Sequence, residues 1–190
     1  MVLKVIYELV KFLKKPDDSR IQLTPKEKIY FLLRLFVFNA VIFLAFLPLL
    51  VLVAEETESE FKRNTDYTEA IVAIGAILVM PVVEEFIFRY FLRYDRINPK
   101  LISLKKWNAV FPWLVYFSAI TFGAIHLFNF SFSSNSWLLL PALVVPQFIT
   151  GLVITFLRVR LNFYYGILYH MLWNFSFFMV IPFLVDLIPE

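Results

Sequence analysis

Long runs of apolar residues, separated by short polar segments, dominate the chain. Stretches over approximately 29–54, 69–92, 107–128, 137–157 and 162–187 are apolar almost throughout. Each is about as long as the 20 helical residues that cross roughly 30 Å of hydrocarbon. The pattern therefore predicts five membrane-spanning helices joined by short polar connections.

The segment before the first run has a different pattern. Residues 1–15 combine apolar positions at helical spacing with four lysines, which is typical of an amphipathic helix lying in a membrane interface. Pro16 ends this helix, and the polar residues after it read as a linker. We therefore divide the chain into a cytoplasmic amphipathic helix and linker, residues 1–28, and a transmembrane domain, residues 29–190. No cleaved signal peptide is expected, because a short apolar core close to the start is missing.

Composition agrees with this pattern. Hydrophobic residues make up 61% of the chain and aromatic residues 19%, well above the share in soluble globular proteins. The fold class that we predict is an all-α integral membrane protein, a bundle of about five transmembrane helices with an N-terminal amphipathic interfacial helix. There is no cysteine, which excludes disulfides, thiolate metal sites and a cysteine nucleophile.

The charges alternate along the connections. The N-terminal segment and the connections 93–106 and 158–160 are basic, whereas 55–69 is mostly acidic. The positive-inside rule then places the N-terminus in the cytoplasm and the C-terminus outside. We expect a multi-pass protein of the bacterial cytoplasmic (inner) membrane. Its expected partners are the lipid bilayer and a peptide or membrane-protein substrate, with no nucleic acid.

Charged side chains interrupt the second apolar run within "PVVEEFIFRY". A charge in the middle of a membrane costs at least about 2.5 to 3.5 kcal/mol, so these side chains are expected to face protein or a water-filled cavity. Glu85 and Arg89 are one helical turn apart and can form an ion pair. Glu84 points about 100 degrees away and lacks that partner. It is therefore the candidate general base or acid.

Two histidines, the only ones in the chain, also lie in predicted spans. His126 ends "FGAIH", with Phe122 one turn earlier, and His170 opens "HMLWN", with Asn174 one turn later. A single intramembrane histidine is more often a hydrogen-bond partner between helices than a catalyst. Three polar sites in one small bundle favour a shared function, in which these side chains converge on one water molecule.

These motifs resemble those of the CPBP family, the CAAX proteases and bacteriocin-processing (Abi) intramembrane proteases. "EEFIFR" resembles the family's EExxxR motif, "FGAIH" resembles FxxxH, and "HMLWN" resembles HxxxN, in the same order and each in a predicted span. The resemblance covers about residues 69–180. It implies an intramembrane endopeptidase whose catalytic residues are Glu84, His126, His170 and Asn174, with Glu85, Arg89 and Phe122 in support.

The resemblance implies peptide-bond hydrolysis by a glutamate-activated water. Glu84 would take a proton from a water held with His126, and His170 with Asn174 would hold the oxyanion. The alternative is a zinc ion bound by Glu84, His126 and His170, which together supply the three protein ligands of a catalytic site. We favour the metal-free scheme, because no His-Glu-x-x-His helix is present and Glu85 would then have to act as base while paired.

Other functions stay open, and the catalytic interpretation also requires that the site residues lie at similar depths in the membrane. A non-catalytic membrane scaffold or a bacteriocin self-immunity protein would use the same fold and cavity, and a small proton-coupled transporter is less favoured because no broken-helix pair marks a substrate site. At 1.5 Å per residue, Glu84 and His170 lie roughly 12 to 14 Å from the cytoplasmic ends of their spans, but His126 lies roughly 28 Å from its own. The histidine meets the others only if its helix is offset or tilted, or begins as late as Pro112.

Overall fold

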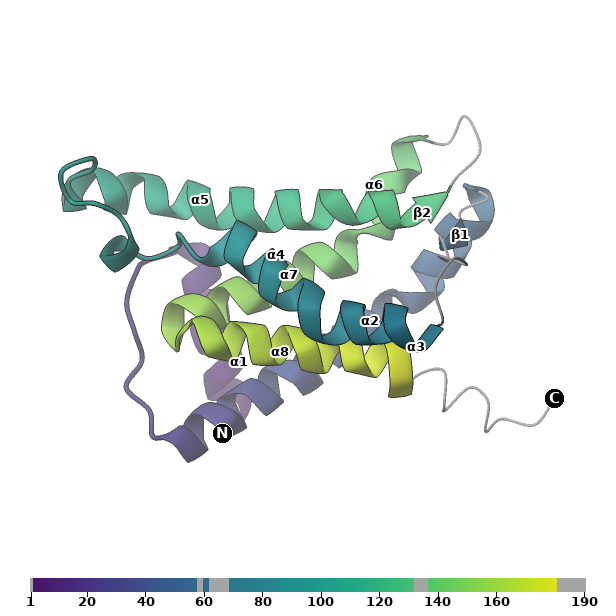
Figure 1. The fold of residues 1–190 in the computed structure, drawn as a ribbon, viewed down its shortest axis with the longest axis horizontal. Helices are drawn as coiled ribbons and strands as arrows, with labels where there is room; N and C mark the ends of the chain where they lie inside the picture. The colour runs from purple at the N-terminus through teal and green to yellow at the C-terminus, as the bar shows by residue number, and fades with distance from the viewer. Residues whose placement is uncertain (1, 58–59, 62–68, 132–136, 181–190) are drawn as a thin grey trace.

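The computed structural model describes residues 2–57, 60–61, 69–131 and 137–180 of the chain, and these are mostly helical (Figure 1). The helices, in chain order, are α1 (Val2–Lys14), α2 (Pro25–Glu56), α3 (Glu69–Ile74), α4 (Met80–Arg89), α5 (Leu104–Ile125), α6 (Leu140–Leu143), α7 (Val145–Arg160) and α8 (Phe163–Phe175). Two short strands, β1 (Glu60–Phe61) and β2 (Phe130–Ser131), pair antiparallel, a contact that the sequence pattern does not indicate.

Within the described ranges, three helical stretches are long and apolar enough to cross a membrane: Pro25–Glu56, Ile71–Arg89 and Leu104–Asn129. They coincide with the first three predicted spans, so an all-α membrane protein is confirmed. The predicted span 137–157 is divided, because helix α6 ends at Leu143 and α7 begins at Val145, with Val144 between them. In the last predicted span, 162–187, the residues from 181 on lie outside the described residues. The count of five spans stays a prediction.

Helix α2 begins where its sequence provides a complete N-cap. The Thr24 backbone N–H donates to Glu27 Oε2 at 2.8 Å, and the Glu27 backbone N–H donates to the Thr24 hydroxyl at 3.4 Å. This reciprocal capping box satisfies two backbone donors that helix geometry leaves unpaired. Pro25 follows at the first helical position, where its missing N–H costs nothing. The helix thus starts four residues before the predicted apolar boundary at residue 29.

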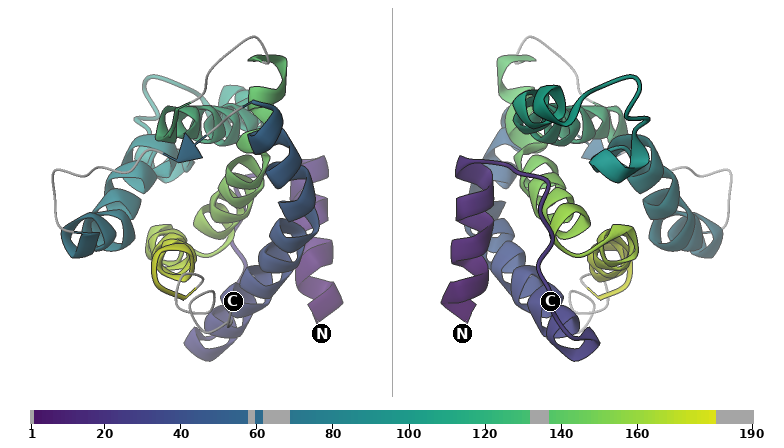
Figure 2. Two further views of the ribbon diagram at one scale, coloured as in Figure 1. Left: turned by 90° about the vertical axis from the view of Figure 1, so that its right-hand side faces the viewer. Right: turned by 90° about the vertical axis from the view of Figure 1, so that its left-hand side faces the viewer.

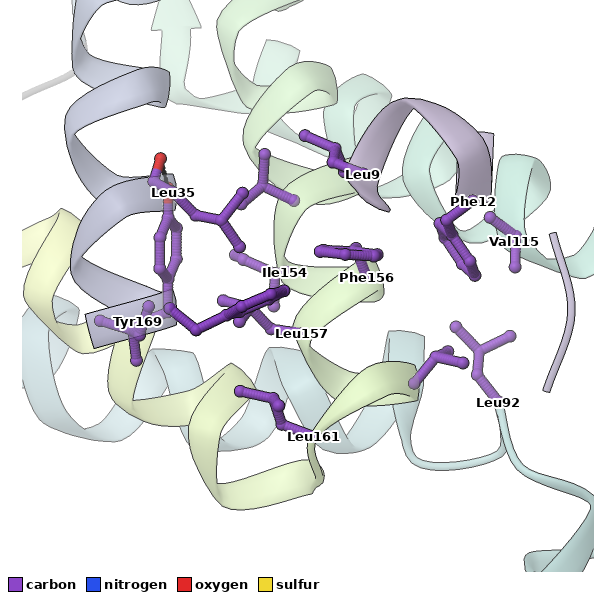
Figure 3. Close-up of a cluster of buried hydrophobic side chains, with 14 of the residues drawn as sticks. Leu9, Phe12, Leu35, Leu92, Val115, Ile154, Phe156, Leu157, Leu161 and Tyr169 are labelled. Atoms are coloured by element: carbon purple, nitrogen blue, oxygen red, sulfur yellow. Dashed lines mark hydrogen bonds between the residues drawn. The ribbon is translucent and has the colours of Figure 1, made fainter. Parts of the chain in front are cut away.

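Helix α7 lies in the middle of the bundle, in contact with α1, α2, α5 and α8 (Figure 2). Every residue from Val153 to Arg160 is buried. A helix that is apolar on all sides is expected in such a central position. Its side chains Ile154, Phe156 and Leu157 form the centre of the main hydrophobic cluster (Figure 3).

Two arginines interlock the end of α4 with the end of α7. Arg158 is buried and donates to two carbonyl oxygens, that of Arg89 at 3.1 Å and that of Tyr90 at 2.8 Å. In return, Arg93 Nη1 donates to the carbonyl oxygen of Val159 at 3.0 Å. The last carbonyls of a helix lack partners within the helix, so these contacts cap both ends and fix α4 against α7.

Helix α1 packs on the outside of the bundle, beside α2 and on the side away from α3 and α4 (Figure 2). Val5, Leu9 and Phe12 are buried in the same hydrophobic cluster as α7 (Figure 3). The opposite face exposes Leu3, Tyr7 and several lysines. One face is thus covered by protein. That the other face lies in a membrane interface stays a prediction. The division of the chain into the units 1–28 and 29–190 also stays a prediction.

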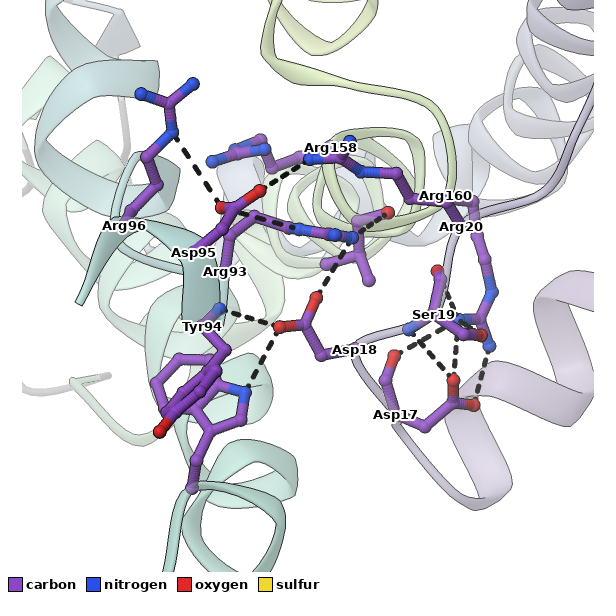
Figure 4. Close-up of polar contacts among 12 residues, drawn as sticks. Asp17, Asp18, Ser19, Arg20, Arg93, Tyr94, Asp95, Arg96, Arg158 and Arg160 are labelled. Carbon is purple, nitrogen blue, oxygen red and sulfur yellow. Dashed lines mark hydrogen bonds and ion pairs between the residues drawn. The ribbon is translucent and has the colours of Figure 1, made fainter. Parts of the chain in front are cut away.

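The linker after α1 is bound to the ends of three helices (Figure 4). Asp18 forms an ion pair with Arg93 at 2.9 Å and accepts a hydrogen bond from the Trp107 indole N–H at 3.2 Å. Asp17 accepts from Arg160 Nη2 at 2.8 Å. The arginine holds the pKa of Asp17 below its ordinary value, although partial burial opposes this. The linker is therefore an ordered part of the fold.

Candidate active site

A cavity of about 460 Å³ lies between the helices, in the range typical of ligand pockets. It is lined by all four residues that the sequence marks as catalytic: Glu84, His126, His170 and Asn174. These side chains come from α4, from the turn after α5, and from α8. The fold thus brings together three motifs that are far apart in the chain, and their catalytic roles stay predictions.

Glu85 and Arg89 lie beside this cavity, not in it. Both side chains have an exposed fraction of 0%. The two residues are one helical turn apart, and Glu85 Oε1 accepts from Arg89 Nη1 in an ion pair. Arg89 Nε also donates to the Thr155 hydroxyl of α7 at 3.2 Å. The expected pairing is present, and the hydrogen bond from Arg89 to Thr155 ties α4 to the central helix α7.

Phe122 contacts three of the charged or titratable groups. The Arg89 guanidinium lies 4.1 Å from its ring centroid, a cation–π contact. The rings of His126 and His170 lie 4.6 and 5.5 Å away. Phe122 therefore contacts both histidine rings, and its supporting role stays a prediction.

His170 bridges the two glutamates of α4. Its Nδ1 lies 2.9 Å from Glu85 Oε1, and its Nε2 lies 3.5 Å from Glu84 Oε2. The Glu85 oxygen is already paired with Arg89 and can only accept, so the hydrogen on His170 is at Nδ1. Its Nε2 then faces Glu84, whose Oε2 is buried and has no hydrogen-bond partner among the described residues.

His126 has a fixed tautomer for a similar reason. Its Nδ1 lies 2.7 Å from the carbonyl oxygen of Phe122, one turn earlier. A carbonyl oxygen only accepts, so Nδ1 carries the hydrogen and neutral His126 keeps Nε2 as an acceptor. Such a ring can accept a hydrogen bond from a water molecule in the cavity.

Asn174 contacts the irregular turn between helices α3 and α4. Its side-chain N–H donates to the carbonyl oxygen of Ala76 at 2.8 Å. Ala76 lies in a π-helical turn, Gly75–Val79, between α3 and α4, and a second such turn, Ser176–Val180, follows α8. Turns of this kind are frequent at functional sites, because they release carbonyls from the helix ladder. One N–H of the Asn174 amide is thus used within the fold.

The start of α5 bears on the depth of His126, which the sequence places deeper in its span than Glu84 and His170. The helix begins at Leu104, capped by Ser103, and Pro112 lies inside it, so the alternative of a start at Pro112 is wrong. In Figure 1, α5 reaches beyond the end of α4. Trp107, in its first turn, has an exposed fraction of 1% and is covered by Tyr94 and the linker. The first turn of α5 therefore packs on the linker, away from the cavity, and the offset of this helix relative to a membrane stays a prediction.

Several residues of the site carry no charge, and a search for ionisable side chains misses them. Thr155 binds Arg89, while Gln147 and Thr150 line the cavity from α7. Thr150 accepts a hydrogen bond at 2.9 Å from Asn39 of α2, which is 2% exposed. Amide and hydroxyl side chains within apolar spans are the signal that would have identified them.

The described side chains show no preformed metal-binding cluster. No group of three or more His, Asp or Glu side chains is placed to hold a metal ion within the ranges that the structure describes. His126 and His170 each direct Nδ1 at a protein oxygen, and His170 Nε2 faces a carboxylate. A histidine that binds a metal commonly donates its second ring N–H to a carbonyl or carboxylate oxygen, so these contacts fit either scheme, and the zinc alternative with Glu84, His126 and His170 stays a prediction.

Comparison with known proteins supports the resemblance in the motifs. A family model described as "Type II CAAX prenyl endopeptidase Rce1-like" matches residues 66–176, more than half of the chain. This range holds Glu84, His126, His170 and Asn174. No curated protein and no solved structure matches the chain. The chain belongs to the Rce1-like family of type II CAAX prenyl endopeptidases.

Proposed function

We propose that this protein is an intramembrane endopeptidase that hydrolyses a peptide bond in the cavity described above. One observation carries the proposal: Glu84, His126, His170 and Asn174, from three separate motifs, line a single cavity. An apolar bundle has no structural need to gather these side chains in one place, since each polar group within a membrane adds cost. The family supports the same kind of reaction.

Glu84 is the general base in this proposal. It is the one carboxylate of the pair that lines the cavity, and its Oε2 has no hydrogen-bond partner among the described residues. A water molecule between Glu84 and the acceptor Nε2 of His126 would be held by both groups. Glu84 takes one proton from the water, and the water oxygen attacks the carbonyl carbon of the substrate.

His170 and Asn174 stabilise the charge that develops. Attack moves an electron pair onto the carbonyl oxygen, which needs hydrogen-bond donors. His170 donates through Nε2 when that nitrogen carries a second hydrogen, and the second N–H of the Asn174 amide is a further donor, since only the first binds Ala76. The C–N bond then breaks, the proton held by Glu84 passes to the leaving nitrogen, and a carboxylic acid and an amine are released.

Glu85 and Arg89 act as positioning residues. Glu85 fixes His170 through the 2.9 Å contact at Nδ1, and Arg89 holds Glu85 in place. This arrangement is the second-layer support that a precise site requires. Neither side chain lines the cavity.

We also propose an orientation with the N-terminus in the cytoplasm of a bacterial cell. Arginines from the ends of α4 and α7 gather at one end of the bundle, together with the linker (Figure 4). A concentration of Arg and Lys at one end favours the cytoplasmic side. Because the chain has no cysteine, single cysteines introduced at Lys15 and Ser103 can be labelled from either side of sealed vesicles. Labelling only from the cytoplasmic side is expected, and labelling only from outside would contradict the orientation.

Purified protein in liposomes provides the test of activity. A fluorogenic CAAX-type peptide is offered with and without a prenyl group on its cysteine, and products are identified by mass spectrometry. We expect cleavage at one peptide bond, with less than a tenth of that rate for His126→Ala at unchanged thermal stability. Equal cleavage by His126→Ala, or none by the folded wild type on either peptide, would contradict the proposal.

A further inference from the structure

Gln147 is a cavity residue to which the proposed reaction assigns no role. It lies near the start of α7, one turn before Gly151, and its side chain lines the cavity. Its side-chain oxygen Oε1 is buried and has no hydrogen-bond partner among the described residues. Leaving a buried acceptor unpaired is costly, and such groups are few in native structures. Because Gln147 lines the cavity, a rotation of its side chain would bring this unpaired oxygen to a ligand that donates.

The position of Gln147 follows from a close crossing of two helices. A Cβ on Gly123 of α5 would lie 3.1 Å from Phe148 Cβ of α7, so the helices approach closely at this pair. Gln147 directly precedes Phe148, and His126 follows Gly123 by three residues. Gln147 and His126 thus flank the same crossing, and both line the cavity there.

The wall around Gln147 is uncharged, and its polar side chains are Gln147 and Thr150. The cavity-lining residues from α2 and α7 are Phe43, Pro146, Gln147 and Thr150. The Thr150 hydroxyl is held by the buried amide of Asn39 at 2.9 Å. The titratable cavity residues all come from α4, α8 and the turn after α5. A phosphate or carboxylate would find no counter-charge on the α7 wall, whereas an uncharged group with both a donor and an acceptor would fit it.

A peptide group has these properties, since it carries one N–H, one C=O and no charge. We propose that Gln147 binds the main chain of the peptide substrate, with Oε1 accepting from one substrate N–H near the bond that is cleaved. The inference rests on the proposed peptidase function and adds a specific substrate contact to it. A contact to the main chain does not depend on the side chains of the substrate. Gln147 therefore aligns the substrate without selecting its amino-acid sequence.

The contact is tested with peptides in which one backbone N–H at a time is replaced by an ester oxygen. Binding is measured to full-length Glu84→Gln protein, so that cleavage does not interfere, with and without Gln147→Met. The probe is whichever form of the CAAX-type peptide, prenylated or not, the wild type cleaves faster. If the wild type cleaves neither form, the prenylated peptide is used. Gln22→Met, at the exposed glutamine of the linker, is the matched control, and thermal unfolding confirms that each variant folds.

We expect one ester position that weakens binding about 5- to 10-fold when Gln147 is present and has little effect in Gln147→Met. In the enzyme with Glu84, Gln147→Met should raise KM by a similar factor with a smaller change in kcat. Equal effects of every ester in both backgrounds, or no peptide binding at all, would overturn the inference. Coupling at one position without any cleavage by the wild type would support the contact and contradict the peptidase function.

Discussion

Glu85 and Arg89, one turn apart on α4, form an ion pair from which solvent is completely excluded. The neighbouring side chain of Glu84 keeps an exposed fraction of 18% and lines the cavity. Two adjacent carboxylates therefore have different environments. Glu85 is paired within the fold, whereas Glu84 borders the cavity in which we propose that the reaction occurs.

Replacing Arg89 by methionine should destabilise the protein strongly. The substitution leaves the Glu85 charge buried without its partner, and breaking such a pair costs about 3 to 5 kcal/mol. The free energy of unfolding in mixed micelles measures the effect. Adding Glu85→Gln to Arg89→Met should recover part of the loss, because the uncompensated charge is then removed. A loss below about 1 kcal/mol for Arg89→Met would contradict the burial of the pair.

Gly151 should not tolerate a larger side chain. A Cβ at this position would lie 3.0 Å from Phe122 Cδ1 and 3.3 Å from Arg89 Nη2. Phe122 contacts both histidines, so Gly151→Ala should cost about 1 to 3 kcal/mol and disturb the site. Gly75→Ala is the control, since nothing lies within 4 Å of the added carbon. Thermal unfolding of the two variants should differ clearly, and equal stability would show that the contact at Gly151 relaxes freely.

The bond between Asp17 and Arg160 should make the attachment of the linker depend on pH. The hydrogen bond from Arg160 holds the pKa of Asp17 below its ordinary value of 3.8. Its contribution to stability is therefore complete above that value and is lost as the pH falls through the lower pKa of the folded state. Thermal unfolding should separate wild type from Asp17→Asn near pH 6, and the difference should shrink below about pH 4. A difference that stays constant down to about pH 2 would contradict this assignment.

Asn174 should contribute to both stability and cleavage. Asn174→Asp keeps the shape but removes the donor to the Ala76 carbonyl oxygen, which should cost about 1 to 3 kcal/mol of unfolding free energy. If the second N–H also stabilises the oxyanion, cleavage should fall about 100-fold or more in molecules that remain folded. Unfolding in micelles and the peptide assay separate the two effects. Unchanged kcat in the folded variant would restrict Asn174 to its structural contact.

The sequence predicts the elements of this site better than their surroundings. Among the described residues, the apolar runs mark three helices that can cross a membrane, and three ionisable residues of the runs, Glu84, His126 and His170, share a cavity. Both signals are local, since a charge within hydrocarbon is costly wherever it occurs. The pairing of Glu85 with Arg89 is local as well, because both lie on one helix face.

Contacts between distant segments could not be predicted in this way. The ion pair of Asp18 with Arg93 joins residues 75 positions apart in the numbering, and no periodicity indicates it. Helix α1 has the pattern of an interfacial helix, but that pattern does not reveal that Val5, Leu9 and Phe12 are covered by protein. The neutral cavity wall at Gln147 carries only the weaker signal of an amide and a hydroxyl within an apolar span, since uncharged polar residues are common in membrane helices.

The central claim is that Glu84 activates the water that cleaves the substrate. It is tested most directly by the cleavage rate of Glu84→Gln, in liposomes, on the peptide that the wild type cleaves fastest. The account predicts a fall in kcat of about 100- to 10,000-fold at an unchanged unfolding temperature, because glutamine has the shape of glutamate but cannot accept the proton. Cleavage within a few-fold of the wild-type rate by the folded variant would contradict the claim.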